Sequence, residues 1–179
     1  NITTGGTGKT PLTAQLLEHC LAQGKSAGVV SRGYGGRIRG PAQVPAAGAC
    51  VGDFGDEPVW LAKQFTGAPI VVARDRVAAV RFLADAKLQV VFADDAFQHR
   101  RLHRDLNIVV VDATAPLWHY RPLPVGRLRE GIGGLSRAHI AVVTKSNLAK
   151  EGQLLVLRGI LKKYFVKPKQ IIELNAELR

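Results

Sequence analysis

A glycine-rich stretch near the start of the chain, GGTGKT, carries residue types that bind phosphate groups. Its glycines let the backbone turn tightly, so that successive N–H groups can point at phosphate oxygens. The Lys9 ammonium can then reach the β- and γ-phosphates of a nucleotide, and the Thr10 hydroxyl can bind Mg²⁺. Thr3 occupies the position where the full nucleotide-binding pattern has a glycine. The residues expected to bind a nucleotide are Gly5, Gly6, Thr7, Gly8, Lys9 and Thr10.

Two adjacent carboxylates, Asp94 and Asp95, follow the hydrophobic run VVFA and could bind the metal ion that accompanies a nucleotide. An acid at the end of a hydrophobic strand is the second component of many phosphate sites. Neighbouring carboxylates repel each other unless a cation lies beside them. Capping of the next helix is the alternative interpretation. The acidic pair and the glycine-rich stretch together favour a site for Mg²⁺ and a nucleotide.

For other polar residues, the sequence gives weaker evidence of a functional role when each residue is considered alone. The stretch VGDFGDEP contains Asp56, which could accept the proton of an attacking hydroxyl group. Plain helix capping is the more common role of such an acid. A structural histidine is the more common role for His99, and a solvated charge is the more common role for Glu130.

Apolar periodicity predicts strands and helices in alternation. Helices are expected over 12–24, 56–65 with Asp56 as N-cap, 75–86 and 154–164. Buried strands are expected at 26–31, 68–73, 88–95, 106–113 and 139–145, and a short apolar run lies at 170–174. This order predicts a mostly parallel sheet with helices on both faces. Ligands of such sheets bind at the carboxyl ends of the strands.

The composition is that of a globular chain with an excess of positive charge. The 179 residues are 46% hydrophobic and carry a net charge of +11, which favours phosphates, nucleic acid or an anionic membrane surface as partners. Only 6% of the residues are aromatic, which argues against a platform for single-stranded nucleic acid. Cys20 and Cys50 are expected to be reduced thiols. No apolar run is long enough to span a bilayer.

The series of motifs resembles the tetraacyldisaccharide 4′-kinase family, the lipid A 4′-kinases of Gram-negative bacteria. The matching stretches run in order from residue 1 to about residue 147, and they are GGTGKTP, SRGYGG, VGDFGDEP, ARDR, DDAFQHRRLHRDLNIVVVD, LPVGRLREG and VVTK. The resemblance implies a P-loop kinase that transfers the γ-phosphate of ATP to the 4′-hydroxyl of a tetraacyl glucosamine disaccharide 1-phosphate. It implies ATP and Mg²⁺ as cofactors and a place in lipid A biosynthesis.

The resemblance also implies roles for individual residues. Lys9 and Thr10 correspond to phosphate and Mg²⁺ contacts, and Asp94 and Asp95 correspond to the acids on the metal side. Asp56 corresponds to the carboxylate that activates the sugar hydroxyl. The residues near the phosphates and the sugar would be Arg76, His99, Glu130, Arg32 and Tyr34, with Arg76 assisting catalysis.

Two departures from the family pattern are present. Ala96 replaces the glycine of DDGFQH, and an alanine there costs about 1–2 kcal/mol if the position needs a left-handed backbone. In LPVGRLRE, Val125 and Arg127 replace an alanine and a proline.

The resemblance further implies a fragment. Residues 1–150 would form most of the kinase domain, without its first strand and N-terminal membrane segment, and residues 151–179 would begin a truncated C-terminal region. The partners would be the lipid A disaccharide precursor and the cytoplasmic face of the bacterial inner membrane, with neither nucleic acid nor an obligate protein partner.

Two other functions fit parts of the sequence. A GTPase of the same fold is suggested by VVTKSN, although Asn147 stands where guanine recognition uses an aspartate. A nucleic-acid-associated P-loop ATPase is suggested by the basic stretch HRRLHR at 99–104.

Overall fold

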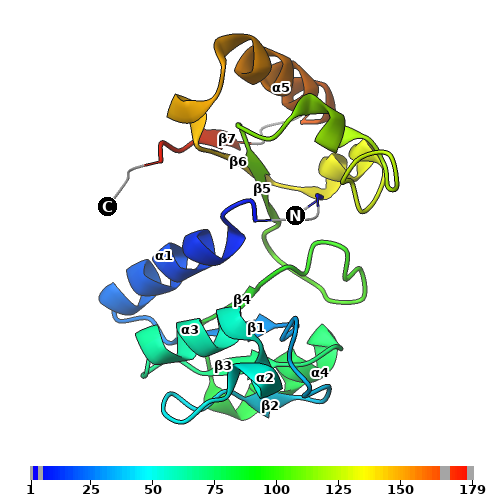
Figure 1. The fold of residues 1–179 in the computed structure, drawn as a ribbon. Helices are drawn as coiled ribbons and strands as arrows, with labels where there is room; N and C mark the ends of the chain where they lie inside the picture. Colours follow the sequence, from blue (N-terminus) through cyan, green and yellow to red (C-terminus); the bar gives the residue numbers. More distant parts are fainter. Residues whose placement is uncertain (1, 4–5, 166–169, 177–179) are drawn as a thin grey trace. The chain divides into compact units, whose positions relative to one another are not determined.

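The computed structural model describes residues 2–3, 6–165 and 170–176, and it divides the chain into two compact units (Figure 1). The first unit consists of residues 1–8 and 103–179, and the second consists of residues 9–102. Each unit has its own sheet. Among the described residues, no helix has both the length and the apolar character needed to cross a bilayer.

The second unit contains a four-stranded sheet in the order β2-β3-β1-β4. Its strands are β1 (Ala27–Ser31), β2 (Ala42–Gln43), β3 (Ile70–Val72) and β4 (Val90–Ala93). β3 and β4 both run parallel to β1, and only the short edge strand β2 is antiparallel. Because β4 ends at Ala93, Asp94 and Asp95 leave the sheet at the carboxyl edge of a parallel strand, as the sequence predicts.

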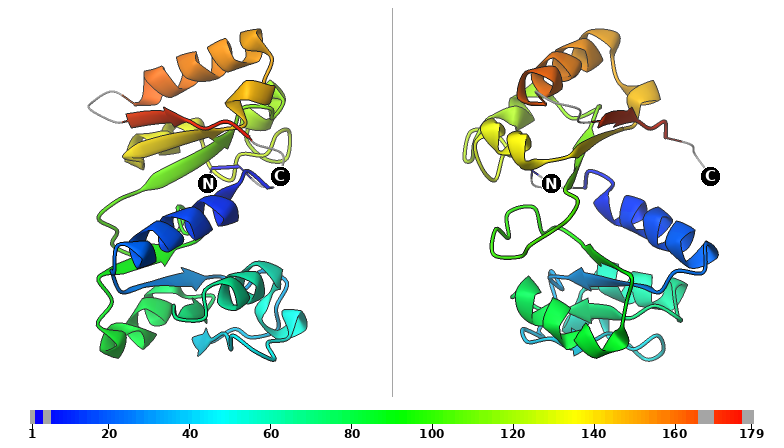
Figure 2. Two further views of the ribbon diagram at one scale, coloured as in Figure 1. Left: turned by 90° about the vertical axis from the view of Figure 1, so that its left-hand side faces the viewer. Right: turned by 180° about the vertical axis from the view of Figure 1, so that it is seen from behind.

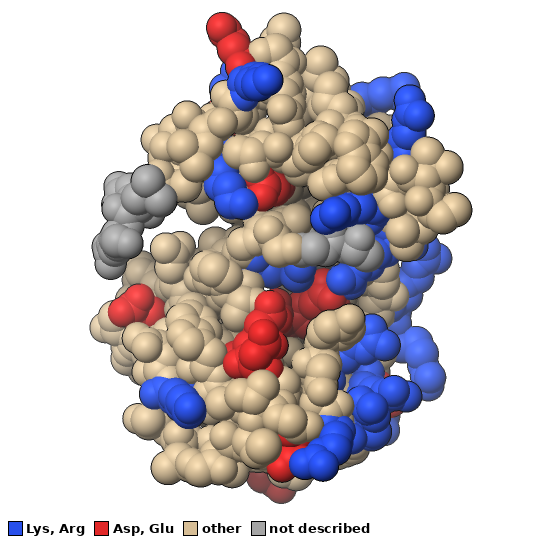
Figure 3. Space-filling view, viewed as in Figure 1, with Lys and Arg blue, Asp and Glu red and all other residues tan. Residues whose placement is uncertain are grey.

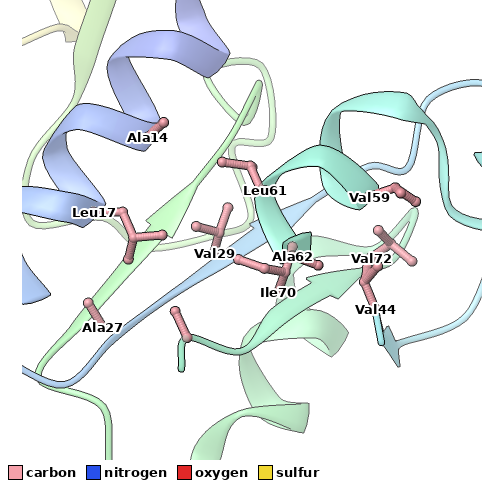
Figure 4. Packing of buried hydrophobic residues seen from close by; sticks show 11 residues of the cluster. Ala14, Leu17, Ala27, Val29, Val44, Val59, Leu61, Ala62, Ile70 and Val72 are labelled. Carbon is pink, nitrogen blue, oxygen red and sulfur yellow. The ribbon is translucent and has the colours of Figure 1, made fainter. Parts of the chain in front are cut away.

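Helices cover both faces of this sheet, because successive side chains of a buried strand point in opposite directions. On one face, Val29 of β1 lies in a cluster with Leu17 of α1 (Lys9–Ala22) and Leu61 of α3 (Asp56–Gln64) (Figure 4). On the other face, Val30 lies in a cluster with Ala79 of α4 (Arg76–Phe82). A short helix, α2 (Val51–Phe54), precedes α3, and a 3-10 turn, η1 (Ala84–Ala86), follows α4.

The start of α3 differs by one residue from the prediction. Gly55 is the N-cap, and its carbonyl accepts a hydrogen bond from the Val59 N–H at 3.3 Å. Asp56 is therefore the first helical residue, and its Oδ1 accepts a hydrogen bond from the Glu57 N–H at 2.9 Å. The prediction of Asp56 as N-cap is wrong because glycine, with φ at 89°, makes the turn into the helix.

The first unit contains a three-stranded parallel sheet in the order β5-β6-β7. Its strands are β5 (Ile108–Asp112), β6 (Ile140–Thr144) and β7 (Gln170–Glu173), so the apolar run near the end of the chain is a strand. The helix α5 (Glu151–Tyr164) lies along one face of this sheet, as Figures 1 and 2 show, and buries Leu157 and Leu161. The described residues of this unit also form the short 3-10 helices η2 (Leu117–Tyr120), η3 (Ile132–Arg137) and η4 (Ser146–Leu148).

The predicted α/β class with mostly parallel strands is confirmed, and the strands are shared between two sheets. β7 pairs with β6, so the described residues after Lys150 belong to the same compact unit as the residues before it. The division into a kinase domain of residues 1–150 and a region of residues 151–179 stays a prediction.

Glycines hold the SRGYGG segment directly against the DFGDEP segment in the second unit. A Cβ atom on Gly36 would overlap the backbone carbonyl of Asp53. A Cβ on Gly55 would lie 2.5 Å from the Tyr34 carbonyl oxygen. An ion pair of 2.9 Å between Arg37 and Asp53 joins the same segments. Two motifs distant in sequence therefore form one packed loop pair that leads into α3.

This close backbone contact predicts that Gly36→Ala destabilises the chain. The added methyl group must displace backbone, and overpacking of this kind costs about 1–3 kcal/mol. The matched control is Gly40→Ala, because Gly40 has open space around it. Urea unfolding followed by circular dichroism measures both variants. Equal free energies of unfolding for the two variants would contradict the proposed contact.

Candidate functional site

The described part of the glycine-rich loop, Gly6 to Gly8, is held by the end of strand β6. The Thr144 hydroxyl donates a hydrogen bond to the Thr7 carbonyl at 3.1 Å. Gly8 has φ at 86°, which favours glycine, and a Cβ there would lie 3.6 Å from Cγ2 of Thr144. Thr144 thus contacts two successive residues of the loop. Gly5, also predicted to bind a nucleotide, lies outside the described residues.

Lys9 and Thr10 begin helix α1, so both lie where the helix dipole is positive. Thr10 is buried. The Lys9 ammonium lies 3.9 Å from Oδ1 of Asp95 within the second unit. The sequence predicts that the acids after β4 lie close to this lysine, and the structure brings Lys9 and Asp95 together.

Asp94 is a buried carboxylate with little local compensation. Asp94 is 4% exposed, and its Oδ2 has no hydrogen-bond partner among the residues that the structure describes. The pKa of Asp94 is raised to about 6, first by burial and then by the charges of Glu57 and Asp95, while the charge of Lys9 opposes the shift. The backbone holds the group in place, because the Asp94 N–H donates to the Val30 carbonyl at 2.9 Å. A carboxylate in this state favours a cation as partner.

Arg76 is the buried cation of the same unit. It is 3% exposed, and Nη1 donates to the carbonyls of Ala73 and Arg74, both at 3.1 Å. Burial lowers the pKa of Arg76, and the charges of Asp95 and Asp94 oppose that shift. The predicted phosphate-side arginine and the predicted metal-side acids therefore lie within electrostatic reach of one another.

The two acids of the GDEP motif have different surroundings. Asp56 and Glu57 are both exposed at the start of α3. Of the two, it is the charge of Glu57 that raises the pKa of Asp94. The sequence interpretation gave a role to Asp56 and none to the neighbouring Glu57. Helical geometry could have shown that Asp56 and Glu57 have different surroundings, because adjacent residues at the start of a helix project about 100° apart.

The remaining predicted residues of the second unit lie in different environments. His99 Nε2 lies 3.6 Å from Oδ1 of Asp75, whose carboxylate caps α4. Arg32 is exposed, and its charge lowers the pKa of Arg76, so these two arginines are within electrostatic reach. Tyr34 is 81% exposed and free to contact a ligand in solution.

Glu130, in the first unit, is held by an ion pair. Nη2 of Arg137 donates to both carboxylate oxygens, at 2.6 and 2.7 Å. The Glu130 side chain is 15% exposed, so the interpretation as a solvated charge is wrong. Its predicted contact with the sugar stays a prediction.

Sequence reasoning missed a polar cluster at the carboxyl ends of β5 and β6. Lys145 donates to Oδ2 of Asp112 at 2.6 Å, and the Thr114 hydroxyl donates to Oδ1 at 2.6 Å. Burial alone would raise the pKa of Asp112, but these hydrogen bonds outweigh it and the pKa is lowered. The position of Asp112 directly after a hydrophobic run, which it shares with Asp94, could have identified this residue from the sequence.

The acids could hold a metal ion only with help from other ligands. Within the described ranges, no three His, Cys, Asp or Glu side chains are gathered closely enough to form a metal site by themselves. Magnesium usually takes one or two protein carboxylates and completes its coordination with phosphate oxygens and water. The unsatisfied Oδ2 of Asp94 fits such an ion.

A glycine-rich loop that leads into a helix, with acids after a parallel strand, defines the P-loop class of nucleotide-binding α/β proteins. Residues 1–177 match the family model described as tetraacyldisaccharide-1-P 4′-kinase. The chain belongs to this family, and the resemblance noted in the sequence is confirmed.

Curated relatives named tetraacyldisaccharide 4′-kinase support the assignment. The protein of Bdellovibrio bacteriovorus is 42% identical over 168 residues, which cover 91% of this chain and 49% of that protein. The protein of Geobacter metallireducens is 45% identical over 151 residues, covering 81% and 44%. The protein of Pseudomonas fluorescens is 49% identical over 134 residues, covering 73% and 39%. The chain thus spans less than half of the length of these relatives.

A solved structure shares the fold. The crystal structure of LpxK from Aquifex aeolicus in complex with ATP matches with a TM-score of 0.70 and 27% sequence identity. The match covers 99% of this chain and 70% of that chain. It confirms the predicted P-loop fold class, while the roles of the individual site residues stay predictions.

The surroundings of Asp94 predict that Asp94→Asn stabilises the chain at high pH. The pKa of Asp94 is raised from 3.8 to about 6. The protonated carboxyl group of Asp94 therefore contributes its full stabilisation below pH 3.8, and this stabilisation is lost as the pH rises through about 6. We expect Asp94→Asn to raise the free energy of unfolding by about 1–3 kcal/mol at pH 8 relative to its effect at pH 4. Urea unfolding at both pH values measures this difference.

The exposed Asp85 of η1 supplies the control variant Asp85→Asn. We expect this variant to show no such gain. If Asp94→Asn changed the free energy of unfolding by the same amount at pH 8 and at pH 4, the raised pKa of Asp94 would be contradicted.

Proposed function

We propose that the protein transfers the γ-phosphate of ATP to the 4′-hydroxyl of a tetraacyl glucosamine disaccharide 1-phosphate in lipid A biosynthesis. The observation that carries the proposal is the distance of 3.9 Å between the Lys9 ammonium and Asp95, in a chain whose family is that of the tetraacyldisaccharide 4′-kinases. This pair joins the lysine of the glycine-rich loop to the acids that follow β4. Phosphoryl transfer depends on such neutralisation of charge.

ATP would be bound by Gly5 to Thr10, with backbone N–H groups and the Lys9 ammonium as donors to its phosphates. The left-handed backbone of Gly8 supports this arrangement, since it turns the chain directly before α1. The related LpxK from Aquifex aeolicus has been crystallised in complex with ATP.

Mg²⁺ would be held by Thr10, Asp94 and Asp95 together with phosphate oxygens. The raised pKa of Asp94 supports this role, because a nearby cation would stabilise the ionised carboxylate. When bound, the ion would neutralise charge that develops on the transferred phosphoryl group. Glu57 would add to the same negative field.

Asp56 would accept the proton of the sugar hydroxyl, and Arg76 would stabilise charge on the phosphates. The exposure of Asp56 at the start of α3 supports its access to a substrate. The burial of Arg76 supports a fixed position for its charge, since its guanidinium is anchored to two backbone carbonyls. A fixed charge costs no reorganisation during reaction.

The disaccharide would contact Arg32, Tyr34, His99 and Glu130. The exposed ring of Tyr34 and the exposed guanidinium of Arg32 support contacts with a sugar and an anionic group. The partners would be the lipid A precursor and the cytoplasmic face of the inner membrane, and the net charge of +11 is compatible with that anionic surface.

Asp56→Asn should abolish most of the phosphoryl transfer. Loss of a general base lowers kcat by about 100-fold or more, because the hydroxyl must then lose its proton without a positioned acceptor. The measurement is transfer of ³²P from ATP to the tetraacyl disaccharide 1-phosphate. Asp85→Asn serves as the matched control and should keep its activity.

Unchanged turnover of Asp56→Asn would remove this residue from catalysis. Turnover of GTP without turnover of ATP would instead favour the GTPase alternative. Binding of duplex nucleic acid that weakens steeply with salt would favour the nucleic-acid-associated ATPase.

Thr144→Val should weaken ATP binding through the glycine-rich loop. The valine has a similar shape but lacks the hydroxyl that donates to the Thr7 carbonyl. Loss of one hydrogen bond of about 1 kcal/mol corresponds to a rise in KM for ATP of roughly 5-fold. Steady-state kinetics should show recovery in Thr144→Ser, which keeps the donor. Equal KM values for the two variants would exclude this positioning role.

A further inference from the structure

One loop of the first unit places large apolar side chains in solvent beside arginines. The 116–128 loop consists of the 3-10 helix η2 and the turn after it, and it contains no acidic residue. Four of its apolar side chains are between 41% and 65% exposed: Leu117, Trp118, Leu123 and Val125. Such a density of exposed apolar groups in a short segment is typical of an interaction surface.

The conformation of the 116–128 loop is held by its own backbone. The Arg127 N–H donates to the His119 carbonyl and the Leu128 N–H donates to the Arg121 carbonyl, both at 3.0 Å. Leu128 is 2% exposed and anchors the loop in the unit. A Cβ on Gly126 would overlap the Arg121 carbonyl, so the turn closes tightly. The apolar side chains are therefore presented to solvent by a built turn.

The charge of the loop is complementary to an anionic lipid surface. Arg121 and Arg127 are both exposed, and the Arg127 guanidinium lies 6.0 Å from the centre of the Trp118 ring. Figure 3 shows Lys and Arg side chains among uncharged ones over the part of the first unit that Figure 1 draws in yellow-green. Tryptophan favours the interface of a bilayer, and arginine binds lipid phosphates.

We propose that the 116–128 loop inserts its exposed apolar side chains into the surface of an anionic lipid bilayer, while Arg121 and Arg127 bind lipid phosphates. This proposal rests on the membrane partner of the proposed function and names the residues that make the contact. Apolar burial and attraction between opposite charges together determine the strength of such interfacial binding.

Trp118 reports directly on insertion. The chain has two tryptophans, so Trp60→Phe leaves Trp118 as the single fluorophore. We expect vesicles of phosphatidylglycerol and phosphatidylcholine to shift its emission to shorter wavelength, and brominated acyl chains to quench it. Vesicles of phosphatidylcholine alone should produce a much smaller effect. An unchanged Trp118 emission with anionic vesicles would overturn the proposal, whatever happens to other variants.

Two pairs of substitutions separate the apolar contribution to vesicle binding from the contribution of the arginines. Leu123→Ser with Val125→Ser should lower the affinity for anionic vesicles by about 10-fold or more. Arg121→Gln with Arg127→Gln should remove the preference for anionic vesicles. The matched control is Leu155→Ser with Val156→Ser on α5, since these side chains are 68% and 45% exposed in the same unit. An equal loss in the control pair would overturn the assignment to the loop.

Other binding partners of the 116–128 loop would give different results in these assays. A Trp118 shift with the dispersed tetraacyl disaccharide, but not with vesicles, would assign the loop to the acyl chains of a substrate and overturn the membrane proposal. Self-association without lipid that Leu123→Ser with Val125→Ser removes would assign it to a second copy. The vesicle assay contains no nucleotide. Absence of vesicle binding with intact phosphoryl transfer to the dispersed substrate would therefore overturn this proposal alone.

Discussion

Burial of the Asp94 carboxylate is the constraint around which the second unit is arranged. An ionised carboxylate in a low-dielectric interior is costly unless cations or hydrogen bonds compensate it. In the described part of the chain, Oδ2 of Asp94 has no hydrogen-bond partner, and Glu57 and Asp95 add like charge. Lys9 opposes them from the first turn of α1. The pKa of Asp94 is raised in spite of this lysine, so a cation bound beside Asp94 would stabilise its ionised form.

The backbone around Asp94 supplies the rigidity that this arrangement requires. The parallel pairing of β4 with β1 continues through the hydrogen bond from the Asp94 N–H to the Val30 carbonyl. The next residue, Asp95, has φ at 47°, so the chain leaves the strand in a left-handed turn. Such a backbone is uncommon for a residue other than glycine. The sharp turn lets two successive carboxylates occupy different surroundings at one strand end.

Patterns local in sequence predicted most of the elements and part of the candidate site. Hydrophobic runs and helical spacing located the strands and helices, and the strand-end rule located Asp94 and Asp95. Their proximity to Lys9 followed from the expected position of a metal-bound phosphate. Boundaries were less predictable: Gly55, rather than Asp56, caps α3 because its positive φ makes the turn.

Properties that arise between distant segments were beyond the sequence patterns. The pairing of Glu130 with Arg137 depends on the path of the chain through η3. The sequence around a charged loop residue does not indicate which residue will pair with it. The fit of Gly36 against Asp53 depends on two backbones meeting. The division of the strands between two sheets also leaves no trace in hydrophobic periodicity, since buried parallel strands look alike in either sheet.

Two aspartates at the carboxyl ends of parallel strands show how the surroundings of a carboxylate determine its charge balance. Asp112 accepts hydrogen bonds of 2.6 Å from both Lys145 and Thr114, and its pKa is lowered. Its charge is already satisfied, so it serves to bind β5 to β6. Asp94 directly follows β4, but its pKa is raised, and its Oδ2 has no hydrogen-bond partner among the described residues. The carboxylate with the raised pKa gains more free energy from a nearby cation than the one already paired, so strand position alone does not identify a metal-binding acid.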